Sequence, residues 1–127
     1  MTTDLLTVYD RAGGTPFFEA LVGGFYAAVA ADPILRPLYP EPDLAGAQHR
    51  LTLFLIQYWG GPTTYSDERG HPRLRQRHFP FAIGPGERDR WLIHMRAAAA
   101  ELAPPPDVAA ELERYFAMAA EAMRNRD

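Results

Sequence analysis

One histidine lies in a segment whose side chains suit an iron-bound cofactor. The chain has four histidines, and His78 lies in the stretch RLRQRHFPF, after several arginines and before two phenylalanines that flank a proline. A neutral imidazole beside apolar rings is what an axial haem ligand requires, because porphyrin needs hydrophobic walls while its iron takes one nitrogen donor. An ordinary surface or core histidine gives the same local pattern, so both interpretations stay open on these residues alone.

The other three histidines show weaker patterns. His49 follows Ala47 by two residues on a predicted helix, about 200° around it, and should face solvent. His71 precedes a proline and fits a turn. His94 borders the buried face of its helix. None of the three is paired with a second ligand at a spacing that suits a metal.

Three aromatic residues carry polar atoms on otherwise apolar helix faces: Tyr26, Tyr39 and Trp91. Core packing, with each polar atom bonded to some backbone group, is the plain interpretation. We find no Ser, His and Asp constellation, no glycine-rich phosphate loop and no Glu-x-x-His pair, so hydrolase, nucleotide and di-iron sites lack support.

Composition excludes further classes of protein. The absence of cysteine excludes disulfides, thiolate-held zinc, iron–sulfur clusters and haem attached through a Cys-x-x-Cys-His motif. All 13 basic residues are arginine, yet the net charge is −3, which argues against a nucleic-acid partner. The N-terminus does not resemble a signal peptide, and no apolar run approaches the ~20 residues that span a bilayer. We expect a cytoplasmic protein without a membrane partner.

The elements that must position these side chains are predicted to be helices. Apolar residues recur at three and four positions, and no stretch alternates as a strand does, so the fold class is all-α. We expect one domain over residues 1–127. The predicted helices cover about 8–12, 15–31, a short stretch from Asp32 to near Tyr39, 44–58, 85–102 and a last helix through 108–123. Residues 62–84 are predicted to be a long loop with at most a short helix around His78.

Three segments of the chain closely resemble group II truncated haemoglobins. They are LYPEPDLAGAQHRL (38–51), YWGGPTTYSDERGHPRLRQRHFPF (58–81) and ERDRWL (87–92). The match extends over nearly the whole chain. The resemblance implies a truncated globin, with a two-over-two helical sandwich around a noncovalent haem b.

The resemblance also implies roles for individual residues. His78 is expected to bind the iron, and the distal ligand pocket to be polar through Tyr26, Tyr39 and Trp91. Ala47 occupies the place where ordinary globins carry a distal histidine, and Leu51 follows one turn later. The remaining haem-binding residues implied are Phe54, Leu55 and Phe81, with Arg50, Arg77 and Tyr65 as partners of the propionates. We expect Arg69 to belong to a solvated loop.

The expected function is reversible, high-affinity binding of dioxygen and other diatomic ligands with slow release. Hydroxyl and indole donors should hold dioxygen, which gains negative charge on ferrous haem, by bonds of about 1.5–3 kcal/mol each. The alternative is an enzyme that oxidises nitric oxide to nitrate or turns over peroxide at the same iron. A third reading is a haem-free helical interaction module. A reductase partner and a homodimer are left open.

Overall fold

The computed structural model describes residues 6–71, 73 and 81–126, and across them the chain folds into helices without a strand. His78 and Arg77 therefore lie outside the described residues. The elements are α1 (Val8–Ala12), α2 (Thr15–Ala30), the 3-10 helix η2 (Arg36–Leu38), α3 (Ala45–Tyr58), α4 (Thr64–Arg69), α6 (Pro85–Leu102) and α7 (Pro106–Met123).

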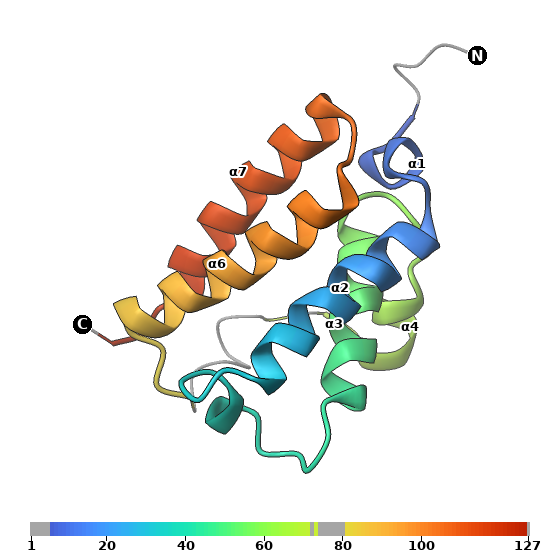
Figure 1. Cartoon of the computed structure of the whole chain (residues 1–127). Coiled ribbons are helices and arrows are strands. Elements are labelled where there is room, and N and C mark those ends of the chain that lie inside the picture. The colour runs from blue at the N-terminus through green and yellow to red at the C-terminus, as the bar shows by residue number, and fades with distance from the viewer. Residues whose placement is uncertain (1–5, 72, 74–80, 127) are drawn as a thin grey trace.

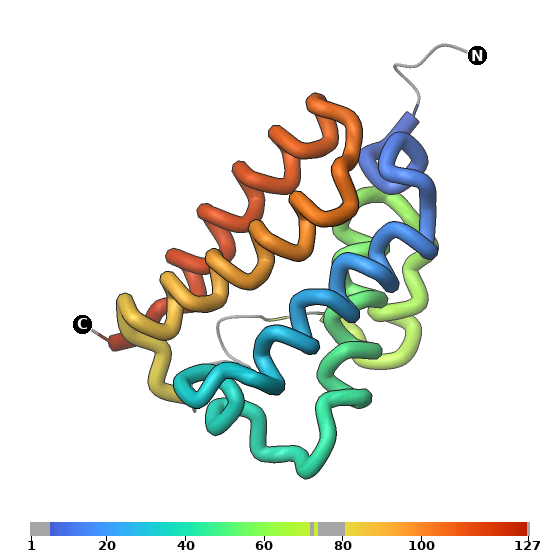
Figure 2. The backbone as a smooth tube through the Cα atoms, in the orientation of Figure 1, coloured from blue at the N-terminus to red at the C-terminus, as the bar shows by residue number. Residues whose placement is uncertain are grey.

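The long helices form two antiparallel pairs. Figure 1 shows α6 and α7 side by side on one side of the molecule, and α2 with α3 on the other. The smooth trace in Figure 2 makes the reversal of direction within each pair easy to follow. Helix α2 packs against both α3 and α6, so it joins the two pairs. This arrangement confirms the predicted all-α class.

The core lies where these helices meet. Its largest fully buried side chains come from α2, α3, α6 and α7, and they include Phe18, Phe25, Phe116, Leu21, Leu55 and Met95. On α7 the buried positions Val108, Leu112 and Phe116 recur every four residues, as one face of a helix requires. Burial of this apolar face is what stabilises such a helix in water.

Proline and capping residues set the helix boundaries. Proline occupies the first turn of α2, α6 and α7, where its missing N–H breaks no helical hydrogen bond. Helix α1 begins with a capping box between Thr7 and Asp10, and ends at Gly13, whose φ of 111° suits glycine. The predicted bounds of α1, α2, α3, α6 and α7 agree with the structure to within one residue or two.

Two elements differ from the predictions. The sequence predicts a long loop over residues 62–84 with at most a short helix around His78, but α4 occupies Thr64–Arg69. Only Tyr65 is buried in that helix, so its sequence lacks the apolar repeat that would reveal it. The short helix predicted from Asp32 is confined to the three-residue η2, because Pro37 and Pro40 limit its length.

Among the residues described, none of the helices has the length and apolar character needed to cross a membrane.

Candidate functional site

A cavity of about 580 Å³ opens between the two helix pairs. Its walls come from α2, the segment around η2, α3, α4, residues 81–83, α6 and α7. Most of the lining is apolar, with a few charged side chains among it. Ligand pockets of this kind commonly measure about 300–1,000 Å³ and combine apolar walls with a few polar groups.

The structure places ten of the twelve predicted site residues at this cavity. They are Tyr26, Tyr39, Ala47, Arg50, Leu51, Phe54, Leu55, Tyr65, Phe81 and Trp91. The other two, Arg77 and His78, lie outside the described residues. The chain thus brings together side chains that are up to 65 positions apart, from Tyr26 to Trp91. Their roles toward a cofactor stay predictions.

The three aromatic residues with polar atoms form one side of the cavity. The Tyr26 and Tyr39 rings meet edge to face, with centroids 5.5 Å apart. Phe25 contacts both Tyr26 and Trp91, at 4.9 and 5.6 Å between ring centroids. These packed rings fix where two phenol groups and one indole face the cavity, because edge-to-face contacts restrict rotation of each ring.

Burial keeps both phenols in their neutral form. The pKa of Tyr26 is raised far above its ordinary value of 10.0, first by burial and then by the neighbouring Tyr39. Burial also raises the pKa of Tyr39, while its hydrogen bond with Tyr26 lowers it. A neutral phenol keeps its O–H and can donate a hydrogen bond. Because the two phenols are hydrogen-bonded to each other, one of their two hydroxyl hydrogens stays free to donate into the cavity.

Arg36 holds the loop that carries Tyr39. Its guanidinium donates to the backbone oxygens of Tyr39 at 2.9 Å, Glu41 at 2.9 Å and Pro42 at 3.0 Å. The planar fork of an arginine suits several acceptors at once. Prolines at positions 40 and 42 stiffen the same loop, so the Tyr39 backbone is held on both sides.

Arg50, predicted as a propionate partner, lies on the cavity wall in an ion pair. Its Nη2 donates to Glu41 Oε1 at 2.9 Å, and both side chains are partly exposed. The pKa of Glu41 is lowered by a backbone hydrogen bond and by Arg50. Arg50 therefore already has a carboxylate partner at the cavity wall.

Tyr65, also predicted as a propionate partner, is buried, and its ring contacts Phe54 with 5.6 Å between centroids.

The expectation for Arg69 is correct in one part and wrong in the other. Arg69 is exposed to solvent as expected, but it belongs to the last turn of α4 rather than to a loop, and it lines the cavity. The error follows from missing α4, since the helix is what brings this arginine to the cavity. His49 is exposed as expected, and its Nε2 lies 3.3 Å from Glu68 Oε1.

Several lining residues were not identified from the sequence. They include Leu35, Glu41, Ile83, Glu87, Met95, Tyr115, Phe116, Ala119 and Met123. Most lie on apolar helix faces that sequence patterns assign to the core, and periodicity does not separate core from cavity wall. Tyr115, on α7, is one such case.

Asn125 ties the C-terminal segment to residues 81–83. Its side-chain oxygen accepts from the Ile83 N–H at 2.9 Å, and its amide donates to the Phe81 carbonyl at 2.9 Å. The Asn125 backbone N–H also donates to Ile83 O at 2.8 Å. Phe81 and Ile83 both line the cavity. Asn125 therefore fixes one wall of the cavity from outside it.

Comparisons with known proteins agree on one family. The family model described as bacterial-like globin matches residues 7–125. A group 2 truncated haemoglobin of Bacillus subtilis is 43% identical over 88 residues, which is 69% of this chain and 66% of that protein. The chain spans about half to two thirds of the length of the curated relatives it matches.

Solved structures match over more of their length. A thermostable haemoglobin of the actinobacterium Thermobifida fusca superposes with a TM-score of 0.93 at 58% identity, covering 94% of this chain and 98% of that one. A group II 2-on-2 haemoglobin of Agrobacterium tumefaciens gives a TM-score of 0.91 at 33% identity, covering all of both chains.

Proposed function

The chain belongs to the bacterial-like globin family, in its group II truncated haemoglobins, and from this premise we propose that it binds haem b noncovalently through His78 and holds dioxygen reversibly with slow release. The observation that carries the proposal is the cavity that Tyr26, Tyr39 and Trp91 share.

The described part of the cavity fits a haem. A porphyrin presents two broad apolar faces and two propionates at one edge. Apolar walls are supplied by Ala47, Leu51, Phe54, Leu55 and Phe81. Cationic groups that suit the propionates are present in Arg50 and Arg69, both on the lining. Arg50 would have to exchange Glu41 for a propionate or bind both.

Haem, when bound, supplies an iron atom at which a diatomic ligand can bind. The chain's own contribution is to direct donors at that ligand. Tyr26 and Tyr39 together offer one O–H that their own hydrogen bond does not use, and the Trp91 indole is a second donor. Each bond to a partly charged acceptor contributes about 1.5–3 kcal/mol. Because about 1.4 kcal/mol is a factor of ten, two such donors slow ligand escape by orders of magnitude.

A structural neighbour supports this reading. A truncated haemoglobin of Bacillus subtilis, described as oxygen-avid, superposes with a TM-score of 0.88 at 35% identity and covers 94% of this chain. Slow release of dioxygen suits a protein of redox chemistry or sensing better than one that delivers oxygen in bulk. Reversible binding needs ferrous iron, so a reductant, in the cell a reductase, belongs to the proposal.

Absorption spectra test the proposal. The purified protein, with hemin added, is compared with His78→Ala and with the control His49→Ala, whose histidine is exposed in the structure. We expect a strong Soret band that shifts on reduction and again with oxygen in wild type and control, and a weakened or altered band in His78→Ala. A protein that ignores hemin, or a His78→Ala variant with the wild-type spectra, would overturn it.

A further inference from the structure

Among the described charged residues outside the cavity, Asp32 has the carboxylate whose two oxygens are most fully supplied with hydrogen-bond donors. Its side chain is 2% exposed. Oδ1 accepts the backbone N–H of Ile34 at 2.8 Å and of Leu35 at 3.3 Å. Oδ2 accepts Nη1 of Arg90 at 3.1 Å and Nε2 of His94 at 2.6 Å. A buried carboxylate is tolerated only when its oxygens are satisfied in this way.

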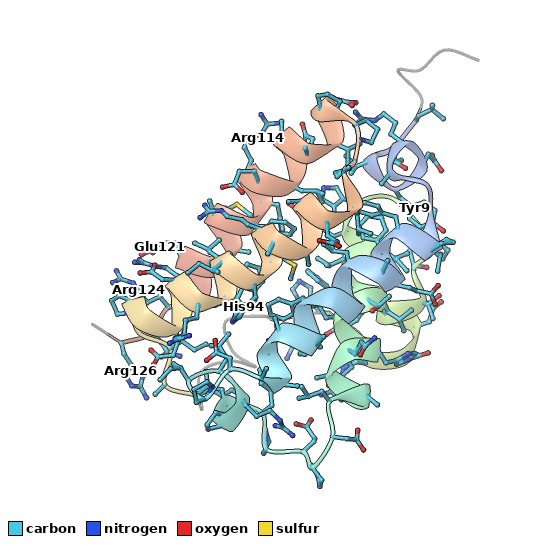
Figure 3. The ribbon with its side chains drawn as sticks, in the orientation of Figure 1. Tyr9, His94, Arg114, Glu121, Arg124 and Arg126 are labelled. Atoms are coloured by element: carbon cyan, nitrogen blue, oxygen red, sulfur yellow. The ribbon has the colours of Figure 1, made fainter. Side chains whose placement is uncertain are left out.

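The two oxygens serve two different elements. Oδ1 holds the turn that leads into η2, and the Asp32 carbonyl accepts the N–H of Arg36, the first residue of η2. Oδ2 holds α6, where His94 lies in the stretch that runs beside α2, as Figure 3 shows. One side chain therefore sets the spacing between the η2 segment and α6.

Both elements carry cavity residues close to these bonds. Leu35, whose N–H binds Oδ1, lines the cavity, and Tyr39 follows η2 directly. On α6, Trp91 is the neighbour of Arg90 and lies less than one turn before His94. A change at Asp32 is therefore transmitted to Tyr39 and Trp91 through short stretches of backbone.

We propose that Asp32 is a positioning residue for the distal donors: by binding the η2 turn with one oxygen and α6 with the other, it fixes Tyr39 and Trp91 relative to each other across the cavity. The proposal rests on the proposed function, in which these two residues face the ligand. A carboxylate that served only to cap the turn would need Oδ1 alone and no partner on α6.

The substitution Asp32→Asn separates the bonds to the η2 turn from the bonds to α6. The side-chain oxygen of Asn can still accept from Ile34 and Leu35, while its NH₂ group cannot accept from Arg90 and can keep His94 only in the tautomer whose Nε2 accepts. The η2 turn is thus kept, the bond to Arg90 is lost and the bond to His94 is weakened. His94→Leu removes one α6 donor, and His94→Gln is the conservative variant that can keep an N–H at the same place. Glu101→Gln, an exposed carboxylate on α6, is the matched control.

Two readouts follow the position of Trp91 and of the donors. The chain has two tryptophans, so its ¹H–¹⁵N spectrum shows two indole peaks, and Trp91→Phe assigns them. The stretching band of carbon monoxide bound to the reconstituted protein reports on donors near the ligand. We expect Asp32→Asn and His94→Leu to shift the Trp91 peak and the carbon monoxide band, and to speed oxygen dissociation roughly tenfold. His94→Gln and Glu101→Gln should stay near wild type.

A lower melting temperature with an unmoved Trp91 peak and carbon monoxide band would overturn the inference, since Asp32 would then serve the fold alone. If Asp32→Asn does not fold, His94→Leu and Arg90→Gln carry the same comparison. If the wild-type protein takes up no haem, the proposed function fails, while the Trp91 peak of the haem-free protein still decides between a positioning and a purely structural Asp32.

Discussion

Tyr26 and Tyr39 meet edge to face, with 5.5 Å between ring centroids and 81° between ring planes, although Tyr26 lies within α2 and Tyr39 directly follows η2. Their hydroxyl groups interact, and burial raises the pKa of both. The two phenols therefore act as one pair, in which each limits the orientation of the other's O–H. A ligand in the cavity meets one free hydroxyl donor, whose direction is set by the contact between the two phenols.

Removing one hydroxyl should show which phenol matters more. Tyr26→Phe and Tyr39→Phe keep the rings and their packing and lose only the donor. We expect oxygen dissociation, followed by stopped flow after reconstitution, to speed up about tenfold or more in at least one of them. In the double variant the effects should not add, because the hydroxyls interact. Tyr9→Phe, which loses a bond to Thr15 away from the cavity, is the control. Unchanged rates in both single variants would contradict the role of the pair.

The bonds of Asn125 to residues 81–83 should matter for stability and for cofactor retention. Asn125→Ala removes the side-chain hydrogen bonds to Phe81 and Ile83 at the cavity wall, together with the one that Oδ1 accepts from Arg126. We expect the free energy of unfolding to fall by about 1–3 kcal/mol in urea titrations, since partly buried partners lose their bonds. Transfer of haem to an acceptor protein should be faster.

Arg126→Ala is the matched control for Asn125→Ala. Its backbone bond to Ile83 survives the substitution, and its exposed side chain donates to the Asn125 carbonyl and Oδ1, so Arg126→Ala removes these bonds but leaves those of Asn125 to Phe81 and Ile83. Equal stability and haem retention in Asn125→Ala and Arg126→Ala would show that the side-chain bonds of Asn125 do not hold the wall.

The sequence predicts the helices well where apolar periodicity and proline agree. Helices α6 and α7 begin at Pro85 and Pro106, and their buried faces repeat as expected. Helix α4 escaped prediction because one buried tyrosine makes no pattern. The resemblance to a known family identified ten residues that meet at the cavity. Periodicity alone assigns most of them to the core and leaves Arg50, Tyr65 and Phe81 unassigned.

Hydrogen bonds and ion pairs between residues from separate elements could not be predicted from the sequence. Asp32 before a proline reads as the start of a helix, and nothing in the local pattern indicates that its carboxylate is buried against α6. The Glu41–Arg50 pair and the bonds of Asn125 are of the same kind. Each depends on how separate elements pack, so only the folded chain reveals it.

Asp32 also gives stability a defined pH dependence. Its pKa is lowered from 3.8 to about 2, first by the hydrogen bond from His94, then by the Ile34 and Leu35 N–H groups and by Arg90, against the effect of burial. A carboxyl group whose pKa is lower in the folded than in the unfolded protein stabilises the fold. This stabilisation is complete when the pH is above the unfolded-state pKa, and it is lost as the pH falls through the folded-state pKa. The stability difference between wild type and Asp32→Asn should thus be full above about pH 4 and shrink toward pH 2. Urea titrations from pH 6 to 2.5 measure it, and a difference independent of pH would contradict the assignment.

Arg36 offers a test in which charge is conserved. Its fork donates to the carbonyls of Tyr39, Glu41 and Pro42, three acceptors that a lysine ammonium on a flexible stem cannot bind in the same fixed geometry. Arg36→Lys should therefore loosen the loop while leaving net charge unchanged. We expect faster amide hydrogen exchange at residues 39–45 and severalfold faster oxygen dissociation, because Tyr39 loses its fixed backbone.

Arg114→Lys, on the exposed side of α7, provides the baseline for an arginine-to-lysine change away from the cavity. Figure 3 labels Arg114 on that helix. If Arg36→Lys alters exchange in the loop without altering ligand release, Tyr39 is held by its contact with Tyr26 rather than by its backbone. If neither changes, the prolines at positions 40 and 42 suffice to hold the loop, and the three bonds of Arg36 contribute nothing further to its order.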